Sequence, residues 1–155
     1  IDFNTMKKNI DIHMNSYAWL AKIVADFMIK KNKGGSIIQT GSIYGVVGQD
    51  VEIYKNTTLN ENVSYSLIKG GIVNLTRLMA SYYGKHKIRV NCLCPGGVED
   101  KNMNSLFKKR YINKVPLKRF CKPEEIASCV LFLGSDASSY ITGATVMVDG
   151  GWTAT

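Results

Sequence analysis

Tyr65 and Lys69 lie four positions apart in residues 65–83, a segment in which apolar residues recur at spacings of three and four. That spacing predicts a helix, and residues at i and i+4 project from the same helix face about one turn apart. A free tyrosine has a pKa of about 10 and is a poor acid-base catalyst at neutral pH, but a nearby ammonium favours the phenolate. The pair therefore predicts a general acid/base, although Y-x-x-x-K alone also occurs by chance on many helices.

Short apolar segments lie on both sides of this pair. Residues 36–40 form a largely apolar run between glycines, as expected for a strand buried in a parallel sheet, and the run leads into Gly41-Ser42-Ile43-Tyr44-Gly45. Residues 88–94 predict a second strand, which Pro95-Gly96-Gly97 stops. The tyrosine and the lysine thus belong to a helix between two predicted strands.

The first third of the chain predicts a long helix over residues 6–31, which Gly34-Gly35 ends. Its apolar stripe consists of Ile10, Met14, Tyr17, Ala21, Val24 and Met28. Residues 43–63 are rich in Asn, Thr and Gly and predict a polar loop that is longer than usual in compact domains. Loops of this length often act as lids.

The last third predicts an irregular segment that reaches Arg119, followed by a helix and a strand. Pro123 stands at a first helical position with acidic residues after it, and the helix is expected to run through Leu133. Residues 144–148 predict the last strand. The order helix, strand, helix, strand, helix, strand indicates an α/β domain with a mostly parallel sheet.

Three motifs in this order resemble the short-chain dehydrogenase/reductase family. The family has S-x-x-G after a strand, Y-x-x-x-K in the next helix and N-x-x-x-P-G after the next strand, and all three stand here on the expected elements, beginning at Ser42, Tyr65 and Asn91. The resemblance implies a Rossmann-like, doubly wound parallel sheet and an NAD(P)-dependent oxidoreductase that acts on an alcohol or a ketone. It continues through residues 122–127, 132–133, 135–136, 141–143 and 148–151, and so covers nearly the whole chain.

The resemblance implies a role for each matching position. Tyr65 is expected to exchange a proton with the substrate's alcohol or carbonyl oxygen, and Ser42 to hydrogen-bond the same oxygen as hydride moves to or from the nicotinamide. Lys69 is expected to favour the phenolate and to hold the nicotinamide ribose. The residues expected at NAD or NADP are Thr40, Gly41, Tyr65, Lys69, Pro95, Gly96, Gly97 and Val98. Those expected at the substrate are Ser42, Ile43, Tyr44 and Gly97.

Parts of the family pattern are missing. The glycine-rich dinucleotide turn and the Asn-Asn-Ala-Gly strand end do not occur in the chain. Residues 40–48 resemble a phosphate loop, but a polar loop follows them where a phosphate loop needs a helix N-terminus, and we reject that interpretation. We therefore expect residues 1–155 to be the C-terminal portion of a single Rossmann-fold domain, with the N-terminal half missing and no turnover alone. The choice between NAD and NADP stays open, because the family recognises the adenosine ribose with residues after its second strand, and those residues lie outside this chain.

Other departures fall on candidate site residues. The family places a proton-relay asparagine in the first long helix, where this chain has His13. A relay role for the imidazole is one hypothesis, and a packed or half-exposed histidine without such a role is the other. Ser42 and Tyr65 lie 23 positions apart, more than is usual in the family, so residues 49–62 are interpreted as an insertion at the site rim that sets specificity. A family threonine that contacts the carboxamide is replaced by Glu99 and its neighbours, so the residue in that role is open.

The insertion, the run 65–72 and the Pro-Gly-Gly loop look most like oxidoreductases of bacterial surface-sugar and flagellin-modification pathways. This implies an amino-sugar or related carbohydrate substrate. The family also implies a homodimer or homotetramer whose interface is formed by the two long helices. A non-catalytic partner or scaffold subunit that keeps the fold without turnover is the alternative.

The bulk composition sets wider bounds. With 45% hydrophobic and 21% charged residues, the 155-residue chain is expected to fold as a globular domain. Apolar stretches fall far short of the roughly 20 residues of a membrane span and no signal-peptide pattern is present, so we expect a cytoplasmic protein without a membrane partner. The four cysteines are expected to be reduced, packed thiols in strand or helix interiors and to hold no metal.

The net charge of +8 raises a second rival, a nucleic-acid-binding module. The basic clusters are short and scattered, and neither a nucleic-acid motif nor an aromatic stacking pattern accompanies them. We expect no nucleic-acid partner and a solvated basic face that attracts an anionic substrate or cofactor.

Overall fold

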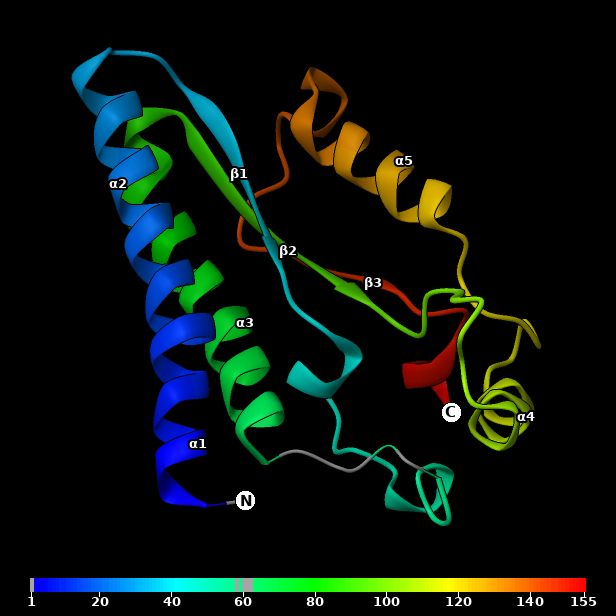
Figure 1. Cartoon of the computed structure of the whole chain (residues 1–155). Coiled ribbons are helices and arrows are strands. Elements are labelled where there is room, and N and C mark those ends of the chain that lie inside the picture. Colours follow the sequence, from blue (N-terminus) through cyan, green and yellow to red (C-terminus); the bar gives the residue numbers. More distant parts are fainter. Residues whose placement is uncertain (1, 58, 60–62) are drawn as a thin grey trace.

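The computed structural model of the chain describes residues 2–57, 59 and 63–155. Three parallel strands form one sheet in the order β1-β2-β3, with β1 at Gly35–Thr40, β2 at Ile88–Pro95 and β3 at Thr145–Val148. Helices lie on both faces of the sheet (Figure 1). The α/β prediction with a parallel, Rossmann-like sheet is thus confirmed.

The first helical region is longer than predicted and is not uniform. It consists of α1 at Phe3–Asn9, a π-helical segment at Ile10–Asn15 and α2 at Ser16–Lys30. Single π-helical turns inside α-helices are frequent at functional sites. Position 13, singled out in the sequence, lies within this π-helical segment.

The first helix ends within one residue of the predicted position, but the two glycines at 34 and 35 are not what ends it. The helix ends in a left-handed Asn32, whose φ is 48°. The Asn32 N–H donates to Ile29 O at 2.9 Å and the Lys33 N–H to Met28 O at 3.1 Å, which is the Schellman pattern of hydrogen bonds. Gly35 instead begins β1.

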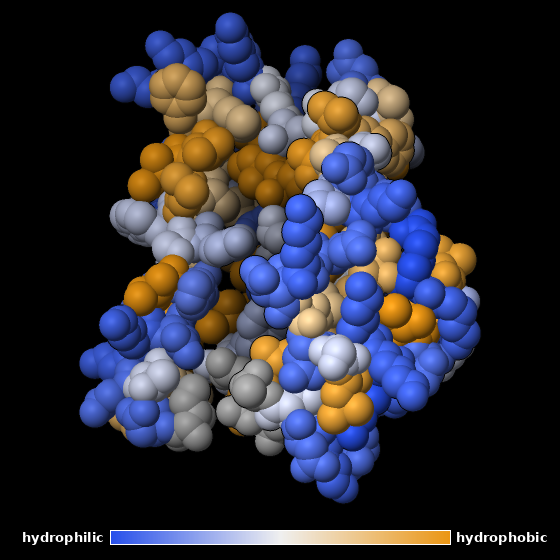
Figure 2. All heavy atoms as spheres, turned by 45° about the vertical axis from the view of Figure 1, so that its right-hand side comes forward, coloured by the Kyte–Doolittle hydropathy of each residue, from blue (hydrophilic) through white to orange (hydrophobic). Residues whose placement is uncertain are grey.

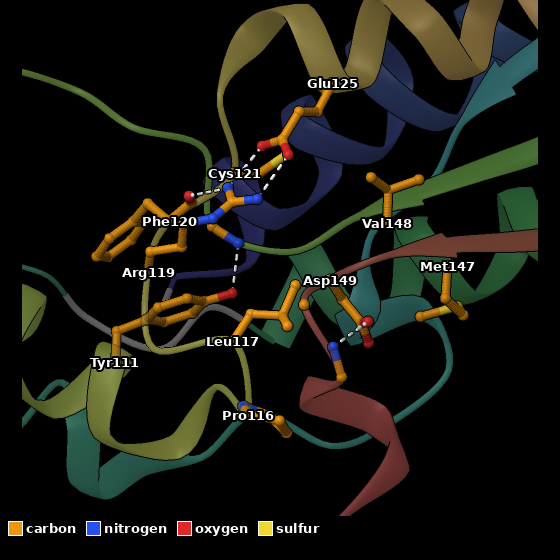
Figure 3. A pocket seen from close by; sticks show the side chains of 13 residues that line it. Tyr111, Pro116, Leu117, Arg119, Phe120, Cys121, Glu125, Met147, Val148 and Asp149 are labelled. Atoms are coloured by element: carbon orange, nitrogen blue, oxygen red, sulfur yellow. Dashed lines mark hydrogen bonds and ion pairs between the residues drawn. The ribbon is translucent and has the colours of Figure 1, made fainter.

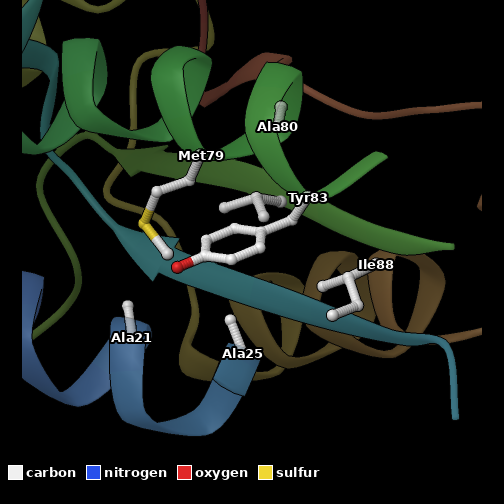
Figure 4. Close-up of a cluster of buried hydrophobic side chains, with 7 residues drawn as sticks. Ala21, Ala25, Met79, Ala80, Tyr83 and Ile88 are labelled. Carbon is white, nitrogen blue, oxygen red and sulfur yellow. The ribbon is translucent and has the colours of Figure 1, made fainter. Parts of the chain in front are cut away.

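The second long helix, α3, spans Val63–Tyr83 and packs beside α2 over one face of the sheet. A core cluster joins the two helices to the strands: Ala21 and Ala25 of α2, Met79, Ala80 and Tyr83 of α3, and Ile88 and Val90 of β2 (Figure 4). Small alanines on α2 let the tyrosine ring of α3 lie between the helices. Of the apolar residues that recur at spacings of three and four in residues 65–83, Ile68, Ile72 and Met79 are buried, so this stripe faces the core.

The opposite face of the sheet is covered by α5 at Pro123–Gly134, as predicted within one residue. Side chains of the strands hold its C-terminal end. The Ser36 hydroxyl donates to Leu133 O at 2.8 Å, and Arg89 Nη2 donates to the same carbonyl at 2.9 Å. These bonds satisfy a carbonyl that a helix end otherwise leaves without a partner.

Asn91 of the N-x-x-x-P-G motif is fully buried in β2 and connects this strand to the segment before β3. Its Nδ2 donates to Ile141 O at 2.8 Å, and its Oδ1 accepts the Ala144 N–H at 3.0 Å. A buried amide with both groups paired fixes two chain segments at once. The asparagine therefore aligns β3 beside β2.

The predicted irregular segment before Arg119 contains a helix that the sequence reading missed. Helix α4 spans Ser105–Lys114, and the Asn104 side chain caps it by accepting the backbone N–H groups of Leu106 and Phe107 at 3.0 and 3.1 Å. Tyr111 is the one residue of α4 that is fully buried. A helix that buries so little apolar surface has a weak hydrophobic period.

The predicted polar loop over 43–63 is partly wrong. Its described part contains 3₁₀ turns at Ile43–Gly45 and Val51–Ile53, which bury Ile43, Tyr44 and Ile53. The insertion assigned to residues 49–62 includes residues 58 and 60–62, which lie outside the described part of the chain. The described part of the insertion is packed against the core through Ile53.

Cys92 and Cys94 are fully buried in β2 and Cys129 lies on α5, as predicted. The prediction for Cys121 is wrong, because this residue lies outside the helices and strands and makes an isolated bridge with Val98. All four are free thiols.

Polar side chains cover much of the face shown in Figure 2, with apolar side chains gathered in a recess in the upper half of the view. Within the described ranges, no helix combines the length and the apolar character needed to cross a membrane.

Glu125 is expected to stabilise the fold at neutral pH and to lose this contribution at acidic pH. Its carboxylate pairs with Arg119 at 2.6 and 2.7 Å and accepts the Lys122 N–H at 2.8 Å, which caps α5. The pairing with Arg119 lowers the pKa of Glu125 to about 2 from 4.5, so the contribution is present above pH 4.5 and is lost as the pH falls toward about 2. Glu125→Gln should lower the Tm modestly at neutral pH, and the gap should narrow below pH 4.5 in thermal melts. A gap that is constant across this range would contradict the ionic contribution.

Candidate active site

Ser42 lies two residues after the end of β1 and caps the 3₁₀ turn Ile43–Gly45. Its Oγ accepts the Tyr44 N–H at 3.2 Å, so the serine caps the turn as short polar side chains do. The residue is buried, and its hydroxyl proton is still available to a hydrogen-bond acceptor. The turn thus fixes where the hydroxyl points.

Lys69 extends from α3 to the end of β1, where its Nζ donates to Thr40 O at 2.9 Å. The ammonium also lies 5.5 Å from the centre of the Tyr17 ring and 5.7 Å from that of Tyr65, within the range of cation-π contacts. Burial lowers the pKa of the Lys69 ammonium, with the cysteine thiols of β2 acting weakly in the opposite direction. The lysine is a partly desolvated cation held between two rings.

Tyr65 lies at the junction of two cavities. One cavity of about 280 Å³, here called the serine cavity, is lined by Ser42, Ile43, Tyr44, Gln49, Tyr54, Tyr65, Pro95, Gly96, Gly97, Phe107 and Tyr111. The other, of about 350 Å³ and here called the lysine cavity, is lined by Asn9, His13, Tyr17, Ser64, Tyr65, Ile68, Lys69 and Ile72. Tyr65 lines both cavities and is 38% exposed.

The serine cavity brings together most of the residues proposed from the sequence. All of the expected substrate residues line it, and so do Pro95 and Gly96 from the expected cofactor loop. The sequence reading missed four of its residues: Gln49, Tyr54, Phe107 and Tyr111. Gln49 and Tyr54 belong to the insertion at residues 49–62, which was predicted to lie at the rim of the site. Phe107 and Tyr111 belong to α4, a helix that was not predicted.

Two hydroxyls of the serine cavity form a pair. Tyr54 Oη and Tyr44 Oη lie 3.0 Å apart, with Tyr54 as the donor. Burial raises the pKa of Tyr44 and, as the largest cause, that of Tyr54, so both phenols stay protonated at neutral pH. The pair offers neutral donors and acceptors to a ligand.

His13 lines the lysine cavity with Tyr65 and Lys69, although the residue is exposed. Three other expected cofactor residues lie elsewhere: Thr40, Gly41 and Val98 are not among the described residues that line either cavity. Gly41 is buried, and a Cβ there would lie 2.6 Å from the Sγ of Cys94. Thr40 contacts the site through its carbonyl, which accepts from Lys69.

The 3₁₀ turn Ile43–Gly45 lies directly against α3, as the surroundings of Gly45 show. A Cβ at this glycine would lie 2.6 Å from the carbonyl oxygen of Lys69 and 2.8 Å from its carbonyl carbon, both backbone atoms that cannot move alone. We expect Gly45→Ala to lower the free energy of unfolding by about 1 to 3 kcal/mol, as overpacking does. Gly48→Ala is the matched control, because a Cβ there meets no atom within 4 Å. Equal denaturation midpoints for the two variants would contradict this contact.

Comparisons with known proteins agree with this arrangement. A family model described as enoyl-(acyl carrier protein) reductase, from the short-chain dehydrogenase/reductases, matches residues 1–153. The chain belongs to the short-chain dehydrogenase/reductase family. The resemblance found in its sequence motifs is therefore confirmed.

Named relatives of this short-chain dehydrogenase/reductase include the post-translational flagellin modification protein A of Campylobacter coli, 34% identical over 145 residues, which cover 94% of this chain and 56% of the relative. Glucose 1-dehydrogenase 2 of Bacillus subtilis is 35% identical over 150 residues, which cover 93% of this chain and 54% of the relative. A short-chain dehydrogenase structure from Leptospira borgpetersenii with bound NAD+ superposes with a TM-score of 0.92 at 35% identity, over 99% of this chain and 58% of that one. The chain thus spans somewhat more than half the length of these relatives.

Proposed function

We propose that the full-length protein is an NAD(P)-dependent oxidoreductase that transfers hydride between the nicotinamide and an alcohol or ketone, with Tyr65 as the general acid/base. The observation that carries the proposal is the position of Tyr65 between the serine cavity and the lysine cavity. Tyr65 thereby shares one cavity with Ser42 and the other with Lys69. Residues 1–155 are taken as the C-terminal, catalytic portion of a single Rossmann-fold domain.

In the reduction direction, Tyr65 gives its phenolic proton to the carbonyl oxygen of a substrate in the serine cavity. Ser42 donates a hydrogen bond to the same oxygen, which stabilises the charge that develops there. The Lys69 ammonium stabilises the phenolate left on Tyr65, and the same groups act in reverse for oxidation. NAD(P)H supplies the hydride when it is bound.

The nicotinamide end of the cofactor fits residues of this chain. The Lys69 ammonium has three donors, of which one is committed to Thr40 O, and it lines an open cavity with Tyr65. These donors suit the hydroxyls of the nicotinamide ribose. Pro95 and Gly96 line the neighbouring cavity with little side-chain bulk, which suits a flat ring.

His13 is proposed as a proton relay from Lys69 to solvent. The imidazole is exposed and lines the same cavity as the ammonium, so it can exchange protons with water and with groups in the cavity. Replacement by asparagine, the family's residue, should preserve the relay, whereas alanine should not.

The substrate is proposed to be an amino sugar or a related carbohydrate. Among the described residues that line the serine cavity, none is charged, and the walls combine aromatic rings with the hydroxyls of Tyr44, Tyr54 and Tyr111. Rings and neutral hydroxyls suit a sugar ring, whereas a carboxylate would meet no cation there. Two relatives carry names that concern flagellin modification and glucose oxidation.

We also propose a homodimer or homotetramer formed through the helices, in the cytoplasm. Exposed apolar side chains on α2 and α3 support the interface, with Trp19 64% and Leu78 65% exposed beside a shared groove. The free thiols suit a reducing compartment. Light scattering of the full-length protein tests the assembly, and a monomer would exclude it.

The experiment for the catalytic proposal is NAD(P)H consumption by the full-length protein. Keto-sugars are compared with an acetoacetyl thioester and a simple aliphatic ketone, and deuteride from labelled NAD(P)H is traced into the product. The proposal expects turnover that is highest with keto-sugars. A protein that binds the cofactor but transfers no label to any ketone would favour the non-catalytic alternative.

A further inference from the structure

Tyr111 of α4 lies in the wall between two cavities. It lines the serine cavity, and on its other side it lines a cavity of about 450 Å³ that also contacts Phe120 and Asp149 (Figure 3). Among the described residues that line these cavities, Gly97 is the other one that both share. This tyrosine and this glycine therefore form one partition.

The ring of Tyr111 is held on both faces. It stacks on Phe120 with centroids 4.6 Å apart and planes inclined by 22°, and on Trp152 with centroids 4.6 Å apart and planes inclined by 18°. The residue is 3% exposed. A ring stacked on both faces cannot tilt without breaking one contact, so the direction of the hydroxyl is fixed.

That hydroxyl accepts the backbone N–H of Gly97 (Figure 3). The Gly97 carbonyl in turn accepts the Cys121 N–H at 2.9 Å, and the Gly96 N–H donates to Val148 O at 2.9 Å. Each of these bonds ties the loop after β2 to a different segment. Of these three partners, Tyr111 bonds through its side chain, whereas Cys121 and Val148 bond through their backbones.

The loop also lies directly on the tyrosine. A Cβ on Gly96 would be 2.7 Å from Tyr111 Oη, and a Cβ on Gly97 would be 2.8 Å from Tyr111 Cζ. Both distances are too short for any side chain. The backbone of the loop is thus in close contact with the ring and its hydroxyl.

Helix α4 is fixed to the insertion as well. Lys114 pairs with Asp50, Arg110 donates to Lys55 O, and the Phe107 and Tyr54 rings lie 5.5 Å apart. One short helix therefore contacts both the insertion and the Gly96-Gly97 loop. A shift of the insertion would be passed to that loop through α4.

We propose that Tyr111 is a positioning residue that sets the Gly96-Gly97 loop against the nicotinamide and links it to the insertion at the substrate side. The identity of the cofactor rests on the proposed function. Tyr111 acts here through the Gly97 amide rather than on reacting atoms. Its hydroxyl, not its ring, carries the effect.

The test is Tyr111→Phe in the full-length protein, which keeps the ring stack and removes the acceptor. Without this acceptor the Gly96-Gly97 loop should leave its position in the free protein, and cofactor binding must then restore that position, so NADH or NADPH should bind about tenfold more weakly in a fluorescence titration. Amide hydrogen exchange in a peptide that contains Gly97 should become faster in the absence of cofactor. Tyr83→Phe, in the core cluster between α2 and α3, is the matched control and should change neither reading.

Unchanged affinity and unchanged exchange in Tyr111→Phe would overturn the proposal, and so would equal losses of affinity in both variants. Failure of the proposed function looks different: the wild-type protein itself would bind neither NADH nor NADPH. The two failures are therefore distinguishable in the same titration.

Discussion

Tyr65→Phe is expected to lower kcat of the full-length protein by about a hundredfold to ten-thousandfold, the usual contribution of a general acid/base. The substitution removes the proton that the substrate oxygen must gain or lose, and it keeps the ring beside the Lys69 ammonium. NADH or NADPH affinity should change by less than about tenfold, because the Lys69 ammonium proposed to hold the ribose is kept and the loss of one neutral hydrogen bond costs about 1 kcal/mol. Steady-state kinetics and a fluorescence titration measure the two quantities.

Tyr82→Phe serves as the control for Tyr65→Phe. Tyr82 belongs to the same helix but is 60% exposed and lines the groove between α2 and α3. Its substitution should leave kcat unchanged. Near wild-type kcat in Tyr65→Phe would assign the acid/base role to another group, and it would remove the central chemical step of the proposal.

Lys69→Met is expected to lower activity strongly while changing the free energy of unfolding little. Loss of the ammonium should lower kcat/KM at least about a hundredfold, because its charge is proposed to stabilise the phenolate and its donors to hold the ribose. The free energy of unfolding at neutral pH should stay within about 1 kcal/mol of the wild-type value, since the loss of one hydrogen bond and of weak ring contacts is partly offset.

The offset follows from the direction of the pKa shift. Burial lowers the pKa of Lys69 below 10.5, so the charged form is disfavoured in the folded state at neutral pH, and this cost disappears as the pH rises through the folded pKa toward 10.5. Methionine removes the cost at neutral pH, although partial exposure of the lysine keeps it small. Chemical denaturation and kinetics check the two halves of the prediction. A large loss of stability with proportional loss of activity would indicate a structural role instead.

Sequence reasoning was most successful where the hydrophobic period was strong. The stripe of α3 and the continuous apolar run of β2 each bury many residues, and such burial produces a clear hydrophobic period in the sequence. Tyr65 and Lys69 were proposed from their spacing on a predicted helix, whereas Ser42 was proposed only through the family pattern. Asn91 had a role only through the family pattern, and the structure gives the physical reason, a buried amide that holds β3.

The parts that sequence reasoning missed depend on contacts between distant segments. Helix α4 buries only Tyr111 completely, so its apolar period was too weak to find, and its cap at Asn104 was the one local signal. Tyr54 lines the serine cavity from the insertion, which the pair of Asp50 and Lys114 joins to α4 across 64 positions of sequence. The role of Asn32 in ending α2 was missed because glycine was assumed to be the left-handed residue, whereas asparagine also adopts this conformation.

The most direct test of the account is a nicotinamide fluorescence titration of the full-length protein with NADH and with NADPH, repeated with Lys69→Met. The account predicts saturable binding of at least one cofactor by the wild-type protein and about tenfold weaker binding by the variant. It would be contradicted if a folded, full-length protein bound neither cofactor, or if Lys69→Met bound the preferred cofactor as tightly as the wild-type protein.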